Sequence, residues 1–160
     1  IELPKKLTVK QNLIVFGKLY KIKNLNDRID YLTSKLRLSD ILNRITGELS
    51  SGQKNRASLA KSLINDPKVL LLDEPTASLD PEIGDFIRSF LEDYKKEKKI
   101  SILLASHNMN EVTRLCKSIL MMKDGIIVDS GSPANLIEKH GRKNLEEVFL
   151  KLSRRPNEHN

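Results

Sequence analysis

Val69 to Leu72 form an unbroken apolar run that is followed at once by Asp73, Glu74 and Pro75. A strand with one face in water would alternate apolar and polar side chains, and this run does not alternate. The run is therefore typical of a strand that is buried on both faces, as in a parallel sheet covered by helices. This feature constrains the fold most, because it predicts an α/β architecture with two acids at the carboxyl end of a buried strand.

The position of the acid pair Asp73 and Glu74 requires an explanation, because an unpaired carboxylate beside an apolar core has a high free energy. In open parallel sheets the carboxyl ends of the strands face the ligand crevice, and successive side chains point to opposite faces. One acid can therefore hold a metal cation while the other orients or deprotonates a water molecule, as nucleotide hydrolysis requires. The alternative interpretation is that these residues merely end the strand in a turn.

A helix is predicted to begin just after Ser50. Ser50 and Gln53 have the spacing of a capping box, and the helical pattern continues to about Ile64, before residues 65–67 stop it. The amides at a helix N-terminus suit a phosphate group, and Gly52 lets the backbone approach a ligand closely. An ordinary capped helix is the alternative.

The segments on either side complete an α/β pattern. Thr8 and Gln11 form a second capping box before a helix over residues 9–20, and helical spacing returns over 27–38 and 40–44. Pro81 opens a helix with apolar positions at i, i+3, i+4 and i+7, as in a surface helix packed on a sheet. The remaining predicted elements are a second buried strand over 100–105, a helix over 109–117, a hairpin over 118–129 and two helices near the end.

His107 lies just beyond the carboxyl end of the predicted strand over residues 100–105. A lone histidine after a strand is usually a loop residue. Its place at the same sheet edge as Asp73 and Glu74 favours a second interpretation, since an imidazole there can bind a terminal phosphate and hold the water-activating acid in place.

Length and composition exclude several classes of protein. The 160 residues suit one domain, with a formal net charge of +7 and 39% hydrophobic residues. No apolar run has the length of a membrane span, and the start shows no signal-peptide pattern. Cys116 is the only cysteine, which excludes an intramolecular disulfide and indicates a reducing cytosol. The basic residues are spread along the chain among few aromatic ones, which favours a solvated surface over a nucleic-acid site.

Four motifs together resemble those of ATP-binding-cassette (ABC) ATPases. They are Leu49 to Gln53 as the signature motif, Leu70 to Thr76 as Walker B, Ala77 to Asp80 as the D-loop, and Ser106 with His107 as the H-loop. They occur in the order and at the spacing of that family, and the similarity runs from about Leu3 to Leu152. One departure is Ser51, where the family usually has glycine.

The resemblance implies a fold and a domain organisation. The fold class would be α/β, a P-loop NTPase-like partial parallel sheet flanked by helices, with an N-terminal helical subdomain. Residues 1–66 would be the helical signature-motif subdomain, with the motif at 49–53. Residues 67–132 would be part of the RecA-like core with Walker B, D-loop and H-loop, and residues 133–160 would be C-terminal helices and a tail.

The resemblance also implies roles for individual residues. Ser50 through Gln53, which include Ser51 and Gly52, would contact the γ-phosphate of an ATP molecule bound by the opposite copy in a head-to-tail dimer. Asp73 would hold Mg²⁺ through water, Glu74 would act as general base, and His107 would bind the γ-phosphate. Asp80 is the predicted N-cap of the next helix, and in the family it also communicates between the two ATP sites.

The chain contains no G-x-x-x-x-G-K-[ST] phosphate loop, since the nearest spacing, Gly47 to Gly52, is followed by Gln53 instead of lysine. We therefore expect it to be the back part of an ATPase domain whose front carries the Walker A loop. On that interpretation the 160 residues alone should bind ATP poorly or not at all. Residues 144–150 resemble the end of ATPase subunits from ABC-2-type exporters.

The leading hypothesis is an ATP-binding and hydrolysing subunit of an ABC transporter that exports a substrate, with ATP and Mg²⁺ as cofactors. Its partners would be a second copy and a transmembrane permease subunit, at the cytoplasmic face of the cell membrane, and no nucleic acid is expected. Two alternatives stay open. One is a soluble ABC-type ATPase that acts on ribosomes or nucleic acid, where the positive charge would serve phosphate contacts. The other is a non-enzymatic folded or regulatory module.

Overall fold

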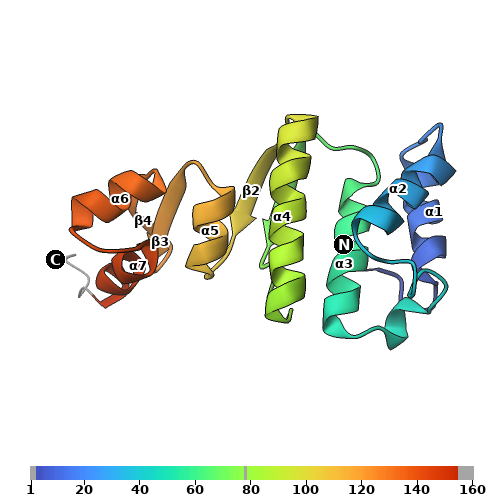
Figure 1. Cartoon of the computed structure of the whole chain (residues 1–160), viewed down its shortest axis with the longest axis horizontal. Coiled ribbons are helices and arrows are strands. Elements are labelled where there is room, and N and C mark those ends of the chain that lie inside the picture. Colours follow the sequence, from blue (N-terminus) through green and yellow to red (C-terminus); the bar gives the residue numbers. More distant parts are fainter. Residues whose placement is uncertain (1–2, 78, 155–160) are drawn as a thin grey trace. The chain divides into compact units, whose positions relative to one another are not determined.

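The structure, a computed structural model, describes residues 3–77 and 79–154. It divides into two compact units, residues 1–105 and residues 106–160. Figure 1 shows the helices and strands of each unit in chain order. The sequence-based division into 1–66, 67–132 and 133–160 stays a prediction, and Ser78 of the D-loop and the tail beyond Arg154 lie outside the described residues.

The first unit begins with a lobe of three mutually packed helices, α1 (Val9–Leu19), α2 (Leu25–Lys35) and α3 (Ser51–Leu63). The predicted capping box is present at α1: the amide N–H of Gln11 donates to Thr8 Oγ1 over 3.1 Å, and that of Thr8 donates to Gln11 Oε1 over 2.9 Å. The fully buried side chains that form the core of the lobe include Leu13, Leu32, Leu36, Leu38, Ile41 and Leu63.

The predicted helix over residues 40–44 is wrong, because this segment forms turns before the short 3₁₀ helix Thr46–Glu48. The carbonyls of Leu42 and Arg44 accept the amide N–H groups of Lys10 and Val9 over 2.9 and 3.1 Å. Those amides belong to the first turn of α1 and have no partner within their own helix. The carbonyls of this segment therefore stabilise the start of α1.

Strands β1 (Val69–Asp73) and β2 (Ser101–Ala105) form a parallel pair in which Leu71 lies opposite Leu103, and helix α4 (Pro81–Lys98) connects them. The parallel pairing confirms the expectation for these two segments. Burial on both faces is wrong for both strands. In β1, Leu70 and Leu72 are buried while Val69 and Leu71 are 58% and 70% exposed, and in β2 no residue is buried and Leu103 is 66% exposed. Within the described part of the first unit, the face of β1 that carries Val69 and Leu71 is therefore left uncovered.

A polar cluster joins α2, α3 and α4. Arg28 of α2 donates to Tyr94 Oη of α4 over 2.8 Å, and Tyr94 in turn donates to Asp66 Oδ1 over 2.7 Å. Arg28 also donates to the carbonyl of Leu63 at the end of α3, where a cation complements the helix dipole. Burial, followed by the hydrogen bond to Asp66, raises the pKa of Tyr94 to about 12. The cluster therefore fixes the three-helix lobe on α4.

The second unit contains helix α5 (Met109–Leu115), strands β3 (Ile119–Lys123) and β4 (Ile126–Gly131), and helices α6 (Pro133–His140) and α7 (Leu145–Arg154). The predicted hairpin is present, with β3 and β4 antiparallel. Asp124 and Gly125 have φ angles of 50° and 78°, which suit the Asp-Gly turn that joins the strands. Among the described residues, no helix is long and apolar enough to cross a membrane.

A buried carboxylate ties β4 to the end of α6. Asp129 Oδ1 lies 2.7 Å from Lys139 Nζ, and Asp129 Oδ2 lies 2.7 Å from His140 Nε2. The hydrogen bond from Lys139 lowers the pKa of Asp129 to about 2, with His140 and the Ser130 amide acting in the same direction against the cost of burial. This group therefore stabilises the fold above its unfolded pKa of about 4, and the stabilisation disappears as the pH falls toward 2.

We expect Asp129→Asn to lower the free energy of unfolding at pH 7 by about 1 kcal/mol, a modest figure because Lys139 is largely exposed and the pair is screened. The difference from the parent should shrink between about pH 4 and pH 2, where the parental carboxylate becomes protonated. Chemical denaturation at pH 7 and near pH 2 measures this, with Asp30→Asn on the exposed side of α2 as the control. An equal loss of stability at both pH values would contradict the assignment.

Candidate functional site

The serine loop, which we define as Ser50 to Gln53, opens α3 as predicted. The amide N–H of Gln53 donates to Ser50 Oγ over 3.3 Å, and the amide N–H of Ser50 donates to Gln53 Oε1 over 3.1 Å. Ser50 and Ser51 are exposed, whereas Leu49 just before them is buried and anchors the loop. The geometry therefore leaves the hydroxyls of Ser50 and Ser51 at the surface, and the amides of Ser51 and Gly52 have no partner within the helix, so these groups can donate to an anion.

The serine loop and Asp80 line one cavity of about 280 Å³. Its remaining walls come from Arg56 of α3 and from Leu79 and Ile83 at the start of α4. Gly52 packs closely against Leu79 here, because a Cβ atom at that position would lie 3.1 Å from Leu79 Cδ2 and would require a small shift of that side chain. The structure thus brings together two motifs that are separated in sequence, and it adds Arg56, which sequence reasoning missed.

Asp80 is the N-cap of α4, as predicted. Its Oδ1 accepts the amide N–H of Ile83 over 2.9 Å, and Pro81 occupies the first helical position. Asp80 is exposed at the rim of the cavity. Its capping role is therefore observed, and communication between two ATP sites stays a prediction.

Asp73 and Glu74 lie at the carboxyl end of β1, with Asp73 exposed and Glu74 half-buried. The amide N–H of Glu74 donates to the carbonyl of Ala105 over 2.9 Å, which prolongs the ladder to β2 by one step. Glu74 has a φ angle of 47°, in the left-handed region that a non-glycine residue seldom adopts.

The acids do not line the cavity of the serine loop within this chain. Two hydrogen bonds nevertheless tie the segment after the acids to α3 and α4. Asn55 Nδ2 of α3 donates to the carbonyl of Pro75 over 2.7 Å, and Arg88 Nη1 of α4 donates to Thr76 Oγ1 over 3.5 Å. Sequence reasoning missed Asn55, since a polar residue on a helix carries no signal of its partner.

His107 is exposed in the turn between β2 and α5 and belongs to the second unit. Its predicted place beside Asp73 and Glu74 stays a prediction. The turn itself is well defined, because Asn108 caps α5 by accepting the amide N–H groups of Asn110 and Glu111 over 3.1 and 3.2 Å.

In the part of the chain that the structure describes, no group of three or more histidine, cysteine or acidic side chains could hold a metal ion. A single exposed carboxylate such as Asp73 is compatible with Mg²⁺, because this ion keeps several waters and takes further ligands from substrate phosphates. The residues therefore fit a hydrated metal that arrives with a nucleotide, and they do not fit a cage built wholly from protein.

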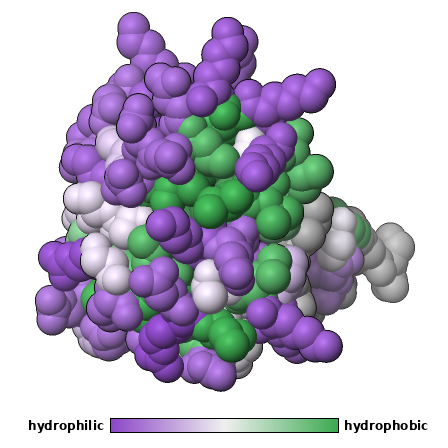
Figure 2. Space-filling view, turned by 90° about the vertical axis from the view of Figure 1, so that its right-hand side faces the viewer, coloured by the Kyte–Doolittle hydropathy of each residue, from purple (hydrophilic) through white to green (hydrophobic). Residues whose placement is uncertain are grey.

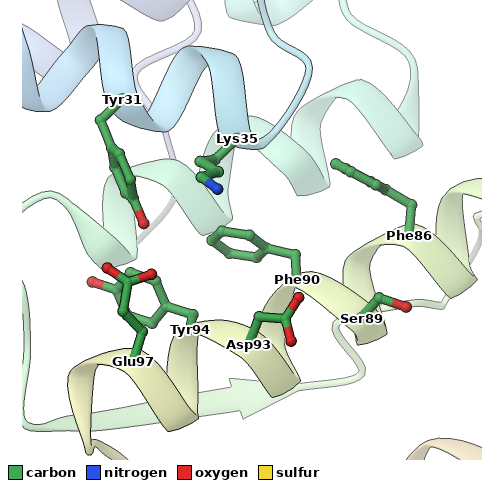
Figure 3. Close-up of a pocket in the computed structure, with 8 residues that line it drawn as sticks. All are labelled: Tyr31, Lys35, Phe86, Ser89, Phe90, Asp93, Tyr94 and Glu97. Atoms are coloured by element: carbon green, nitrogen blue, oxygen red, sulfur yellow. The ribbon is translucent and has the colours of Figure 1, made fainter.

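A second hollow of about 280 Å³ lies between α2 and α4 (Figure 3). Tyr31 and Lys35 line it from α2, and the residues from α4 are Phe86, Ser89, Phe90, Asp93, Tyr94 and Glu97. It contains none of the residues predicted from the sequence to act on a nucleotide. Tyr94 and Phe90 are almost fully buried there, so its aromatic wall is largely the junction between the lobe and α4.

Comparison with known proteins identifies ATP-binding proteins of transport systems as relatives. The family model described as "ABC transporter" matches residues 1–77. The ABC transporter ATP-binding protein NatA of Bacillus subtilis is 35% identical over 147 residues, which are 91% of this chain and 59% of that protein. The Nod factor export ATP-binding protein I of a Rhizobium species is 37% identical over 92% of this chain and 49% of its own length. The methionine import ATP-binding protein MetN of Streptomyces griseus is 39% identical over 70% of this chain and 31% of its own length.

Two solved structures show the same fold. The ATP-binding subunit of an ABC transporter has a TM-score of 0.80 and 24% identity over 94% of this chain and 64% of its own. A dimeric ATP-binding cassette in a post-hydrolysis state with ADP and Pi has a TM-score of 0.73 and 24% identity over 81% of this chain and 58% of its own. The predicted fold class is confirmed. The chain spans between about half and three fifths of the length of the first two bacterial relatives above.

Proposed function

Because this chain belongs to the family of ABC transporter ATP-binding domains, we propose that it forms part of a subunit that binds and hydrolyses ATP to drive transport. The observation that carries the proposal is the common cavity of the serine loop and Asp80 at the surface of the first unit. A donor-rich loop that faces outward from its own domain suits a nucleotide presented by another molecule. The acids at the end of β1 supply the second half of such a site.

In the proposed arrangement two copies close head-to-tail, so that the serine loop of one copy faces the acids of the other. Ser50 through Gln53 donate hydrogen bonds to the γ-phosphate held by the opposite copy. A closed dimer with two identical interfaces produces two equivalent sites. The structural neighbour that holds ADP and Pi is itself dimeric.

Asp73, Glu74, His107 and Asp80 then each have a distinct role. Asp73 holds hydrated Mg²⁺, which when bound neutralises the charge on the phosphates. Glu74 accepts a proton from the attacking water, and its fixed backbone next to Ala105 keeps the carboxylate oriented. His107 donates a hydrogen bond to the γ-phosphate, and Asp80 at the cavity rim connects the two sites.

The direct test of the proposal is ATP hydrolysis by the full-length protein purified with its transmembrane partner. Hydrolysis that requires Mg²⁺ is the expected result. A full-length protein that binds no ATP would contradict the proposal.

The proposed transmembrane partner docks on the three-helix lobe. Figure 2 shows an apolar area, in green and surrounded by hydrophilic residues, on the side of the molecule where α1 and α2 lie in Figure 1. The exposed apolar side chains at the end of α1 are Val15, Leu19 and Tyr20. Exposed apolar groups with a polar rim are typical of protein contacts, and a permease would place the subunit at the cytoplasmic face of the membrane. Export is the proposed direction.

We expect Leu19→Asp to weaken copurification with the transmembrane subunit by roughly tenfold or more, because a charge would replace an exposed apolar anchor. Leu150→Asp is the matched control, since Leu150 is an exposed leucine on α7 in the other unit. Quantitative pull-down from detergent extracts measures both variants. If Leu19→Asp retained the partner as well as the control does, the docking surface would lie elsewhere.

A further inference from the structure

Glu111 of α5 is a fully buried carboxylate four residues after His107 in the chain. Ser106 Oγ donates to Glu111 Oε2 over 2.7 Å, and the amide N–H of Asn108 donates to Ser106 Oγ over 3.1 Å. Asn108 Oδ1 accepts the amide N–H of Glu111 over 3.2 Å. These three bonds close a ring through Ser106, Asn108 and Glu111, and the backbone of His107 lies within that ring.

Helix capping does not explain why the Glu111 carboxylate is buried. Glu111 Oε1 is buried and has no hydrogen-bond partner among the described residues, and a buried acceptor without a partner is destabilising. Glu147 provides the comparison within the same unit. Asn144 accepts its amide N–H over 2.9 Å, and its carboxylate accepts the amide N–H of Lys143 over 3.3 Å, yet Glu147 remains partly exposed to water.

We propose that Glu111 is a positioning residue that holds the turn around His107 and thereby sets the direction of the imidazole. The ring fixes Ser106 on one side of His107 and the Asn108 amide on the other, which restricts rotation of the two peptide planes that flank the histidine. A small rotation of these peptide planes changes the backbone dihedral angles of His107 and moves the end of its side chain over a large distance. The contribution of His107 to phosphate binding rests on the proposed function, whereas its orientation by Glu111 does not.

The test is NMR spectroscopy of the full-length protein with ¹⁵N-labelled histidine, in which His107→Gln identifies the His107 signals by their loss. Ser106→Ala and Glu111→Ala should each shift and broaden the imidazole signals of His107. The double variant should show no further change, because both substitutions open the same ring. Ser106→Thr keeps the hydroxyl and should restore the parental signals.

Glu147→Ala is the matched control, since it removes a similar helix-start carboxylate from the same unit. Its His107 signals should stay at the parental position, and the signals of His140, which contacts Asp129, should stay in place in all variants that fold. If Glu111→Ala loses the His140 signals through unfolding, the pair Ser106→Ala and Ser106→Thr decides the question. Unchanged His107 signals in a folded Ser106→Ala variant would overturn the proposal. ATP hydrolysis is not the readout, so this inference and the proposed function fail separately.

Discussion

Replacing Glu74 with glutamine in the full-length protein should leave ATP binding intact and lower turnover by about 10²–10⁴-fold, the usual contribution of a general base. The amide has the size of the carboxylate but does not accept a proton from water. The amide N–H of Glu74 would still donate to Ala105, so the backbone at φ 47° should be preserved. Steady-state kcat and the ATP dissociation constant are the quantities to measure.

Glu82→Gln is the control for this experiment, because Glu82 is a highly exposed acid in the first turn of α4. It should hydrolyse ATP at the parental rate. A Glu74→Gln variant as fast as the parent would show that another group activates the water. Loss of ATP binding in that variant would assign Glu74 to binding instead of catalysis.

Ser50→Ala should reduce turnover by about 10²–10³-fold, the effect of removing one preorganised donor to a developing negative charge. It should also cost about 1 kcal/mol of stability, since Ser50 Oγ accepts the amide N–H of Gln53 at the start of α3. Thr8→Ala is the matched control, because Thr8 forms the same capping box at α1 and lies outside the cavity of the serine loop.

The two cap variants separate stability from function. Both should lower the melting temperature by similar amounts, and only Ser50→Ala should lose turnover. Equal turnover in the two variants would mean that the serine loop is no more than a helix cap.

Local sequence patterns correctly predicted the elements that depend on interactions between residues close together in the chain. The capping boxes at Thr8 and Ser50, the N-cap at Asp80 and the Asp124–Gly125 turn each depend on residues within one or two turns of chain. The helix predicted over 40–44 was wrong because this segment makes interactions with residues far away in the chain. Its carbonyls accept amides from the start of α1, some 30 residues earlier in the chain, and no local pattern contains that information.

The candidate site was also predicted only in those parts that do not depend on contacts between residues distant in the sequence. Spacing identified the serine loop and the acids, but the cavity is lined jointly by the start of α3 and by Leu79, Asp80 and Ile83, and this juxtaposition is tertiary. The one-sided burial of Leu70 and Leu72 likewise depends on which elements cover β1. Glu111 lies in a segment that the sequence predicted only as a helix, and its full burial depends on tertiary packing.

In the proposed dimer, the serine loop of one copy completes the site formed by Asp73 and Glu74 of the other copy. This arrangement can be tested by mixing equal amounts of full-length Glu74→Gln and full-length Ser50→Ala, because each variant alone is expected to be nearly inactive. In a head-to-tail dimer, half of the mixed population pairs one copy of each kind, and one of its two sites then has both Glu74 and Ser50 intact. The mixture should therefore regain about a quarter of the parental turnover. A mixture no more active than either variant alone would show that both residues act within a single copy and would rule out the head-to-tail arrangement.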